Sequence, residues 1–389
     1  MDAAGVGAVI TKVISRKEHF PPAWIHGFPY RAVVQGDSWL LRGDPRLDLE
    51  YGVWLIKEAR KRLSIPIIAS MMGHADKVDI WVDNALTLQK AGAHALELDL
   101  FCPLERKGAR QADSRPELDP GNPIMAHPDM VGRVVKGLTQ ALDIPIIPKL
   151  TPIGGKGIIE VAQACVANGA KTLTMANAMG GNAGVDIYKN GETLFPNSSP
   201  ASFAIYLGKY LWPIHSMNLV MLSKALQGRG IPISSGGGVS TWEEIVQRIM
   251  LGANNVQLCS ALYLGGRGVV KKCLNGLEVY LNEYGYKSIN EIRSKGLVGI
   301  DATANGSEIA PSVAQIKKPL ECLKCANPCV DKVTADCLAM TMGDDGVPKI
   351  DATKCTGCAL CYWCCDSKAI DMIRTEKHVD YRVINGFQT

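Results

Sequence analysis

The chain has 389 residues, of which 47% are hydrophobic and 21% charged, a composition typical of a globular protein with a large core. The formal net charge of +4 is spread along the chain, whereas nucleic-acid-binding proteins concentrate Lys and Arg in a dense stripe. No apolar run approaches the roughly 20 residues that span a bilayer, and residues 1–13 lack the basic segment of a signal peptide. The sequence therefore predicts a cytoplasmic protein that binds no nucleic acid and has no membrane span.

Residues 1–300 repeat one pattern, in which a short β-rich apolar run is followed by a turn and a segment of helical periodicity. Apolar strands that alternate with helices are typical of a parallel β/α architecture. Helices are expected at Val78–Ala91, Ile158–Asn168 and Trp242–Leu251. Seven runs predict strands, at 7–14, 65–72, 93–101, 144–150, 171–177, 231–235 and 254–262.

Seven strands over about 300 residues suit a (β/α)8-type barrel better than a doubly wound sheet. Residues 2–5 are typical of the end of a helix, so we expect the first β/α unit of the barrel to be missing from this sequence. The alternative is that a strand elsewhere has gone unrecognised. Within residues 184–200, Asn190-Gly191 predicts a hairpin that follows the strand ending at Asn177.

The run Cys355-x2-Cys358-x2-Cys361-x3-Cys365 is typical of [4Fe–4S] ligation, in which the fourth cysteine usually binds a second cluster. An earlier run, Cys322-x2-Cys325-x3-Cys329-x7-Cys337, has wider spacing. Cys361-x2-Cys364 is an alternative spacing, and zinc, which normally uses two separated Cys-x2-Cys pairs, is the alternative metal. Crossed ligation predicts one cluster held by Cys322, Cys325, Cys329 and Cys365, and the other by Cys337, Cys355, Cys358 and Cys361.

Nine of the 13 cysteines lie between positions 322 and 365, and such clustering in a cytosolic chain indicates metal binding rather than a disulfide framework. We therefore expect a small α+β domain of the bacterial ferredoxin type after the barrel. The predicted boundaries are 1–300 for the barrel, 301–320 for a linker, 321–376 for the ferredoxin-like domain and 377–389 for a C-terminal tail.

Three consecutive glycines, Gly236, Gly237 and Gly238, end the strand at 231–235 and precede a helix. Backbone N–H groups at such a junction can bind a phosphate, and β/α barrels typically place this site after their last two strands. A second small-residue loop, Cys259-Ser260, follows the final strand. Both Ser240-x-x-Glu243 and Thr241-x-x-Glu244 fit a capping box at the start of the helix. The alternative is a plain tight turn.

Lys12 and Lys149 lie near the carboxyl ends of two predicted strands. A lysine in the mouth of a barrel needs an anionic partner, and a reduced flavin ring is one such partner. The alternative is that each lysine lays its aliphatic chain along the protein surface and keeps its ammonium group in solvent.

Five segments, ALELDLFCP (95–103), IPKLTP (147–152), TMAN (174–177), SGGGV (235–239) and VQLCSAL (256–262), resemble the FMN barrel of the dihydroorotate and dihydropyrimidine dehydrogenase family. The C-terminal cysteine runs resemble the dihydropyrimidine dehydrogenase branch. The resemblance implies an FMN-binding barrel with two [4Fe–4S] clusters. It also implies that FMN is held by Thr11, Lys12, Lys149, Asn177, Gly236, Gly237, Gly238, Cys259 and Ser260.

The sequence departs from this family at the expected substrate site. Asp99 stands where pyrimidine-reducing relatives have Asn, and Asn177-Ala178 stands where they have Asn-Thr. The family's acid/base loop carries Cys or Ser, but here it spans Gly121–His127 and the expected cysteine falls near Ile124. We take Asp99 and Asn177 as substrate-binding residues.

His127 is our candidate for the proton donor, because it lies in the acid/base loop and histidine is a common general acid in proteins. The alternative is a helix-start residue that faces solvent. Asp99, Glu105 and His74 are the competing candidates.

The expected activity is that of a dihydropyrimidine dehydrogenase-like oxidoreductase acting on a CH–CH or C=C bond, with electrons relayed between the clusters and FMN. No second dinucleotide fingerprint occurs, so we expect an FAD-containing NAD(P)H-oxidising subunit or a ferredoxin as partner, in a homo- or hetero-oligomer. The alternative is a non-catalytic electron-transfer subunit. A third interpretation keeps pyrimidine as the substrate but with a substituted acid.

Overall fold

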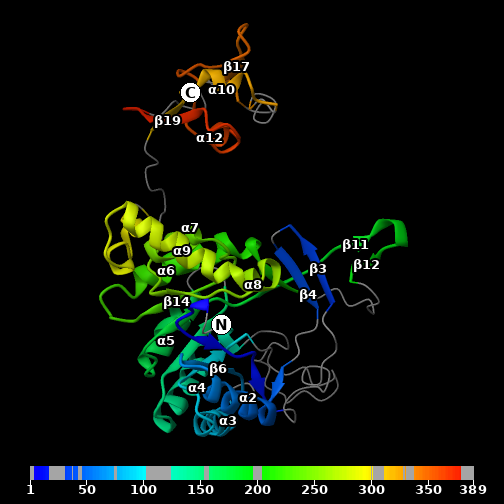
Figure 1. Ribbon diagram of the computed structural model, residues 1–389, viewed down its shortest axis with the longest axis vertical. Helices are drawn as coiled ribbons and strands as arrows, with labels where there is room; N and C mark the ends of the chain where they lie inside the picture. The colour runs from blue at the N-terminus through cyan, green and yellow to red at the C-terminus, as the bar shows by residue number, and fades with distance from the viewer. Residues whose placement is uncertain are drawn as a thin grey trace. The chain divides into compact units, whose positions relative to one another are not determined.

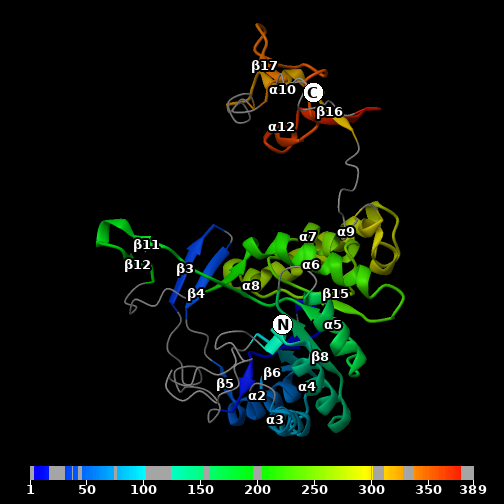
Figure 2. The same ribbon diagram turned by 180° about the vertical axis from the view of Figure 1, so that it is seen from behind.

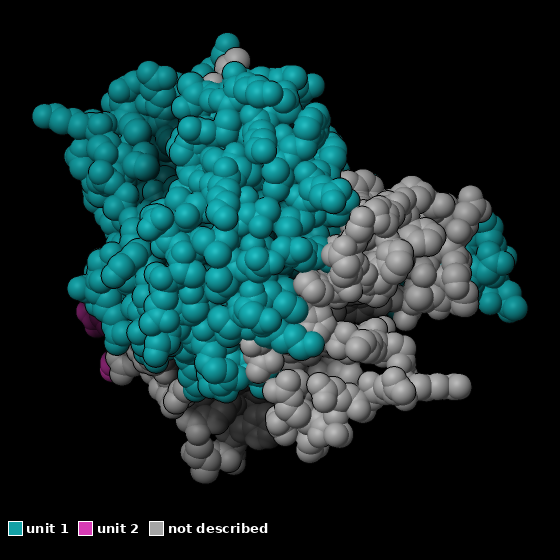
Figure 3. All heavy atoms as spheres, turned by 90° about the horizontal axis from the view of Figure 1, so that it is seen from below, with its two compact units in different colours: residues 1–302 teal, residues 303–389 magenta. Residues whose placement is uncertain are grey.

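The computed structural model describes residues 4–16, 31–36, 38–42, 46–73, 77–101, 124–152, 157–195, 204–298, 300, 311–326, 329 and 337–377. The chain divides into two compact units, residues 1–302 and 303–389, which Figure 3 colours separately. Within the described residues, no helix has the length and apolar character needed to cross a membrane.

The first unit is built on a parallel sheet in which the strands from β6 to β15 follow one another in chain order, whereas β5 lies at the edge and pairs with β2. Its order is β15-β14-β9-β8-β7-β6-β2-β5, and β1 also pairs with β6. Each of the seven predicted segments contains a strand, but residues 260–262 of the last segment belong to a helix. The bounds are β1 Val9–Ile10, β2 Ile14–Ser15, β5 Leu47–Asp48, β6 Ile67–Met71, β7 Ala95–Asp99, β8 Ile146–Leu150, β9 Leu173–Met175, β14 Ile233–Ser235 and β15 Asn255–Val256.

Helices connect successive strands and pack on the outer face of the sheet (Figures 1 and 2). The predicted helices are observed as α3, α5 and α7, each within two residues of its expected bounds. The helices are α2 Leu49–Arg62, α3 Val78–Lys90, α4 Pro128–Ala141, α5 Gly157–Ala167, α6 Trp212–Ala225, α7 Trp242–Met250, α8 Ser260–Gly265 and α9 Gly268–Glu283. Short 3-10 turns are η3 Ile124–Ala126, η4 Ile187–Lys189, η5 Lys209–Leu211, η6 Ile289–Glu291 and η7 Lys295–Leu297.

The sheet curls on itself, as the alternation of β7 shows. Leu96 and Leu98 belong to the apolar core, whereas Glu97 points to the opposite face. There Glu97 accepts a hydrogen bond at 3.1 Å from Gln257, which follows β15, four places away in the strand order. A flat sheet could not bring these side chains together, so the unit has the α/β barrel fold that the sequence predicts. Within the described residues, the pairing order ends at β15 on one side and β5 on the other.

A smaller antiparallel sheet, with the order β10-β13-β4-β3, joins two segments far apart in the sequence. Its strands are β3 Arg31–Gln35, β4 Ser38–Arg42, β10 Met179–Gly181 and β13 Ala204–Gly208. The expected hairpin is confirmed: β11 Val185–Asp186 pairs with β12 Glu192–Thr193. At its turn Asn190 has φ 50° and Gly191 φ 81°, left-handed values that suit Asn-Gly.

The second unit contains two antiparallel strand pairs and two short helices. The strand β16 Ser312–Ile316 pairs with β19 Ile370–Arg374, and β17 Met340–Met342 pairs with β18 Pro348–Ile350. The helices are α10 Pro319–Cys322 and α12 Leu360–Trp363. Because β16 lies inside the segment 301–320, part of the expected linker is a strand of this unit, and the compact unit begins earlier than the cysteine pattern suggested. The cysteine spacing could not reveal β16, whose partner is more than 50 residues away.

Candidate functional site

The side chains of Lys149 and Glu97 form an ion pair near the carboxyl ends of β7 and β8. Lys149 is the register partner of Asp99 across the two strands. Its Nζ lies 3.2 Å from Oε1 of Glu97, whose side chain is only 1% exposed. The sequence predicted an anionic partner for Lys149, and the structure supplies this carboxylate from within the chain.

The pKa of Lys149 is raised above its ordinary value. Burial by itself would lower this pKa, but the negative charges of Glu97 and Asp99 act in the opposite direction and outweigh it. Lys149 is therefore held as a cation inside the barrel at neutral pH.

The other oxygen of Glu97 anchors a polar network across the barrel interior. It accepts hydrogen bonds from Thr174 at 3.2 Å and from Gln257 at 3.1 Å, and Gln257 also donates to Ser234 at 3.0 Å. The sequence interpretation passed over Glu97. Its signal was a charged residue two positions before Asp99 in an otherwise apolar strand, which places both on the same face.

Asp99 lies at the centre of a second group of contacts. It forms an ion pair with Arg46 at 3.3 Å and accepts hydrogen bonds from Asn177 Nδ2 at 3.0 Å and from the N–H of Phe101 at 3.1 Å. Burial acts to raise the pKa of Asp99, but the charges of Arg46 and Lys149 and these hydrogen bonds hold it below its ordinary value. The two predicted substrate residues, Asp99 and Asn177, are thus in direct contact.

Arg46 was missed by the sequence analysis. It lies immediately before β5, in a segment that carried no recognised motif, yet it is only 6% exposed. Nothing in the local sequence indicates that this arginine is buried beside Asp99.

The glycine loop after β14 has a left-handed backbone at two positions. Gly237 and Gly238 both have φ +79°. A Cβ at Gly237 would lie 2.8 Å from the ring of His215, and one at Gly238 would lie 2.9 Å from the backbone nitrogen of Trp212. Only glycine fits at these two positions, because the left-handed conformation and the close packing both exclude a side chain.

The predicted capping box at Thr241 and Glu244 is confirmed. Glu244 accepts hydrogen bonds from the N–H groups of Ser240 and Thr241 at 2.7 and 3.2 Å, and it also pairs with Lys209. These N–H groups are therefore occupied by the chain itself. Among the described residues, those of Gly237 and Gly238 donate to no backbone carbonyl and remain available to an anion.

The remaining predicted flavin residues lie at other strand ends. Thr11 follows β1, and its Oγ1 accepts a hydrogen bond from the N–H of Ser70 at 3.0 Å. Lys12 is exposed. Cys259 is exposed and precedes α8, which begins at Ser260.

His127 is the residue that precedes α4, and its carbonyl accepts from the N–H groups of Met130 and Val131. Its Nε2 is buried and, in the described part of the chain, has no hydrogen-bond partner. The rest of the acid/base loop up to Pro123, together with His74 and Glu105, lies outside the described residues.

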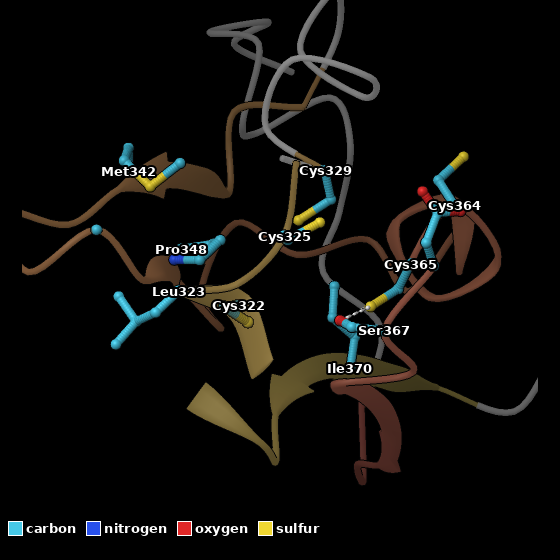
Figure 4. Close-up of a pocket in the computed structure, with 12 residues that line it drawn as sticks. Cys322, Leu323, Cys325, Cys329, Met342, Pro348, Cys364, Cys365, Ser367 and Ile370 are labelled. Atoms are coloured by element: carbon cyan, nitrogen blue, oxygen red, sulfur yellow. Dashed lines mark hydrogen bonds between the residues drawn. The ribbon is translucent and has the colours of Figure 1, made fainter. Parts of the chain in front are cut away.

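Several cysteines of the second unit belong to a small apolar core or pack against it. One pocket is lined by cysteines from both runs, and Figure 4 shows the sulfur atoms of four of them turned toward a shared space, with that of Cys364 turned away. These four are Cys322, Cys325, Cys329 and Cys365.

Among the other cysteines, Cys361 belongs to the same small core as Cys329. Burial and the nearby Cys355 raise the pKa of Cys361 to about 11, and the charge of Cys358 adds to this effect. Cys337 and Cys355 pack against the core that contains Cys361. No described cysteine is in a disulfide. Within the described residues no three Cys, His, Asp or Glu side chains converge as ligands of one metal ion.

The family model for dihydroorotate dehydrogenase matches residues 49–281, more than half of the chain. The catalytic subunit of dihydroorotate dehydrogenase B (NAD(+)) from Pyrococcus abyssi is 28% identical over 290 residues, 74% of this chain and 86% of that protein. The corresponding subunit from Methanosarcina mazei is 29% identical over 291 residues, 74% of this chain and 82% of that protein.

A further relative is the NAD-dependent dihydropyrimidine dehydrogenase subunit PreA from Escherichia coli. It is 26% identical over 300 residues, which cover 77% of this chain and 61% of that subunit. This match therefore spans less than two thirds of the length of PreA. Together with the parallel barrel and its glycine loop, the family match establishes that the chain belongs to the dihydroorotate dehydrogenase family of oxidoreductases.

Proposed function

We propose that the chain is an oxidoreductase that uses FMN and two [4Fe–4S] clusters to act on a CH–CH or C=C bond of a small pyrimidine-like or other unsaturated substrate. The observation that carries this proposal is the buried group of charges at the carboxyl ends of β7 and β8. A barrel that buries Glu97, Asp99 and Arg46 and leaves the Lys149 side chain only 18% exposed bears a desolvation cost for four ionised groups. Such sites are typically functional.

The residues present fit FMN. When bound, FMN supplies hydride transfer to and from carbon. Lys149, held cationic by Glu97, would stabilise negative charge on the flavin ring system. The N–H groups of Gly237 and Gly238 would bind the phosphate.

The substrate would bind beside Asp99 and Asn177. Asn177 Oδ1 accepts from the N–H of Ala178 at 3.0 Å, so its amide group is held with Nδ2 toward Asp99. Ionised Asp99 can only accept hydrogen bonds, so it would orient a substrate through an N–H group. His127 is the proposed proton donor, and its buried Nε2 is the atom that would carry the proton.

The second unit fits the two clusters. No described cysteine of this unit is in a disulfide, and cysteines of both runs line one pocket, as crossed ligation requires. A cubane binds its four thiolates at separate iron atoms, so its ligands need not converge on one point. We propose Cys322, Cys325, Cys329 and Cys365 for one cluster and Cys337, Cys355, Cys358 and Cys361 for the other, with an NAD(P)H-oxidising subunit or a ferredoxin as electron donor.

Anaerobic purification of the full chain, followed by flavin and iron analysis, tests the cofactors. Turnover is then measured with an artificial electron donor against pyrimidines, dihydropyrimidines and other unsaturated compounds. Lys149→Met should abolish turnover, whereas Lys171→Met, an exposed change at the opposite end of β9, should leave it unchanged. Bound cofactors without turnover on any substrate would instead favour a non-catalytic electron-transfer subunit.

A further inference from the structure

Arg248, on α7, is a fully buried cation behind the glycine loop. Its side chain has 0% exposure, and its guanidinium carbon lies 4.2 Å from the centre of the Trp212 ring. Its Nη2 donates to the carbonyls of Gly237 at 2.8 Å and Trp212 at 3.2 Å, and its Nη1 lies 3.5 Å from Ser235 Oγ. All of these partners are uncharged.

The charge of Arg248 has no counter-ion in the part of the chain that the structure describes. Glu244, one turn earlier on α7, pairs with Lys209 instead. The Nε of Arg248 is buried and has no hydrogen-bond partner there. Burial lowers the pKa of Arg248 to about 9, which still leaves the guanidinium charged at neutral pH. A buried charge without an opposite charge is costly, so a nearby anion would be strongly favoured.

His215 does not contribute positive charge behind the loop. His215 is on the neighbouring helix α6, and its ring lies against Gly237. Burial, and then the charge of Arg248, lower its pKa to about 4. At neutral pH His215 is therefore uncharged, and the positive charge behind the loop belongs to Arg248.

The bond from Arg248 to Gly237 also orients the loop. A trans peptide holds its C=O and N–H on opposite sides, and the described chain contains no cis peptide bond. The carbonyl of Gly237 faces Arg248. The N–H of Gly238 belongs to the same peptide unit and therefore points away from Arg248, to the side on which a ligand would bind.

We propose that Arg248 is a positioning residue for the phosphate of the flavin cofactor, which it serves by fixing the loop with an N–H outward and by placing a positive charge behind it. The inference rests on the proposed function, which supplies the phosphate. In the protein interior a charge acts through a low dielectric, so contact between Arg248 and the phosphate is not required.

The test compares FMN with riboflavin, which has the same ring system but no phosphate. Binding of each to the flavin-free full chain is measured by quenching of flavin fluorescence. Arg248→Met should weaken FMN binding by roughly tenfold or more, about 1.4 kcal/mol, while riboflavin binding changes by less than about threefold. Arg248→Lys, which keeps the charge, should restore most of the preference for FMN. Arg229→Met, an exposed change before the opposite end of β14, is the matched control.

An equal loss of both ligands in Arg248→Met would indicate a purely structural role and overturn the inference, as would an unchanged preference for FMN. If Arg248→Met does not fold, Arg248→Gln takes its place, since it removes the charge but can still donate to Gly237. A wild-type chain that does not bind FMN, or binds it no better than riboflavin, would count against the proposed flavin site itself. The wild-type measurement thus separates the two failures.

Discussion

Asn177 donates from Nδ2 to Oδ1 of Asp99 at 3.0 Å and joins two side chains that lie 78 residues apart in the chain. The side-chain Oδ1 of Asn177 already accepts from the N–H of Ala178, so the side-chain amide has one orientation. This bond and the ion pair with Arg46 both favour the ionised form of Asp99. The hydrogen bond between Asp99 and Asn177 therefore connects the end of β7 to the segment that follows β9.

Asp99→Asn should lower the free energy of unfolding at neutral pH, and the difference from wild type should shrink in acid. The folded pKa of Asp99 lies below its ordinary value of 3.8, so its stabilisation is fully present above pH 3.8. It is lost as the pH falls from 3.8 through the lower, folded pKa. Urea unfolding followed by tryptophan fluorescence between about pH 7 and about pH 3 measures this difference.

Asp129→Asn is the control for this experiment. Asp129 pairs with Arg133 at 2.9 Å on the exposed side of α4, where solvent screens the interaction. Its replacement should change stability little at any pH. A difference between Asp99→Asn and wild type that stays constant across the pH range would contradict the assignment of this linkage to Asp99.

Glu97→Gln should destabilise the barrel by about 3 kcal/mol, because it removes the nearer counter-ion of a buried lysine. It should also weaken flavin binding, since Lys149 would lose the group that holds it in place and keeps its pKa high. Denaturant unfolding and flavin titration give the two values. Glu58→Gln removes a carboxylate of the same type from a surface pair with Lys61 and should be close to neutral. Equal effects of the two substitutions would contradict a special role for Glu97.

Gly238→Ala should reduce both stability and FMN binding. The new Cβ would lie 2.9 Å from the nitrogen of Trp212 and 3.0 Å from the carbonyl oxygen of Gly208, both backbone atoms that cannot move aside alone. Gly191→Ala is a matched control, because Gly191 has φ +81° but open space around its Cβ position. Both substitutions should lower the free energy of unfolding by about 1–2 kcal/mol through backbone strain. Only Gly238→Ala should lose more stability than this and also lose FMN binding.

Cys358→Ser and Cys322→Ser should each remove roughly half of the bound iron, because each is expected to ligate a different cluster. Cys364→Ser should leave the iron content unchanged, since its sulfur is turned away from the four that face the shared pocket in Figure 4. Iron analysis and low-temperature electron paramagnetic resonance of the reduced protein distinguish these cases. Loss of iron in Cys364→Ser would favour the alternative Cys361-x2-Cys364 spacing.

Features set by local periodicity and turn chemistry were predictable from the sequence alone. The seven barrel strands, the helices α3, α5 and α7 and the Asn190-Gly191 hairpin all appear where the sequence placed them. So does the capping box of α7. Each depends on residues close together in the chain, so a short window contains the whole signal. The family resemblance, carried by short motifs at strand ends, is predictable for the same reason and is confirmed by the family match.

The tertiary structure alone decided which charges are buried and what they face. Glu97 as the partner of Lys149, Arg46 beside Asp99 and Arg248 behind Gly237 all depend on the curling of the sheet or the packing of α7 on the loop. The pairing of β16 with β19 was likewise not predictable from local pattern. Arginine is normally exposed, and a helical or strand pattern does not show which residues lose contact with water. Burial depends on contacts between distant segments, and these exist only once the barrel has folded.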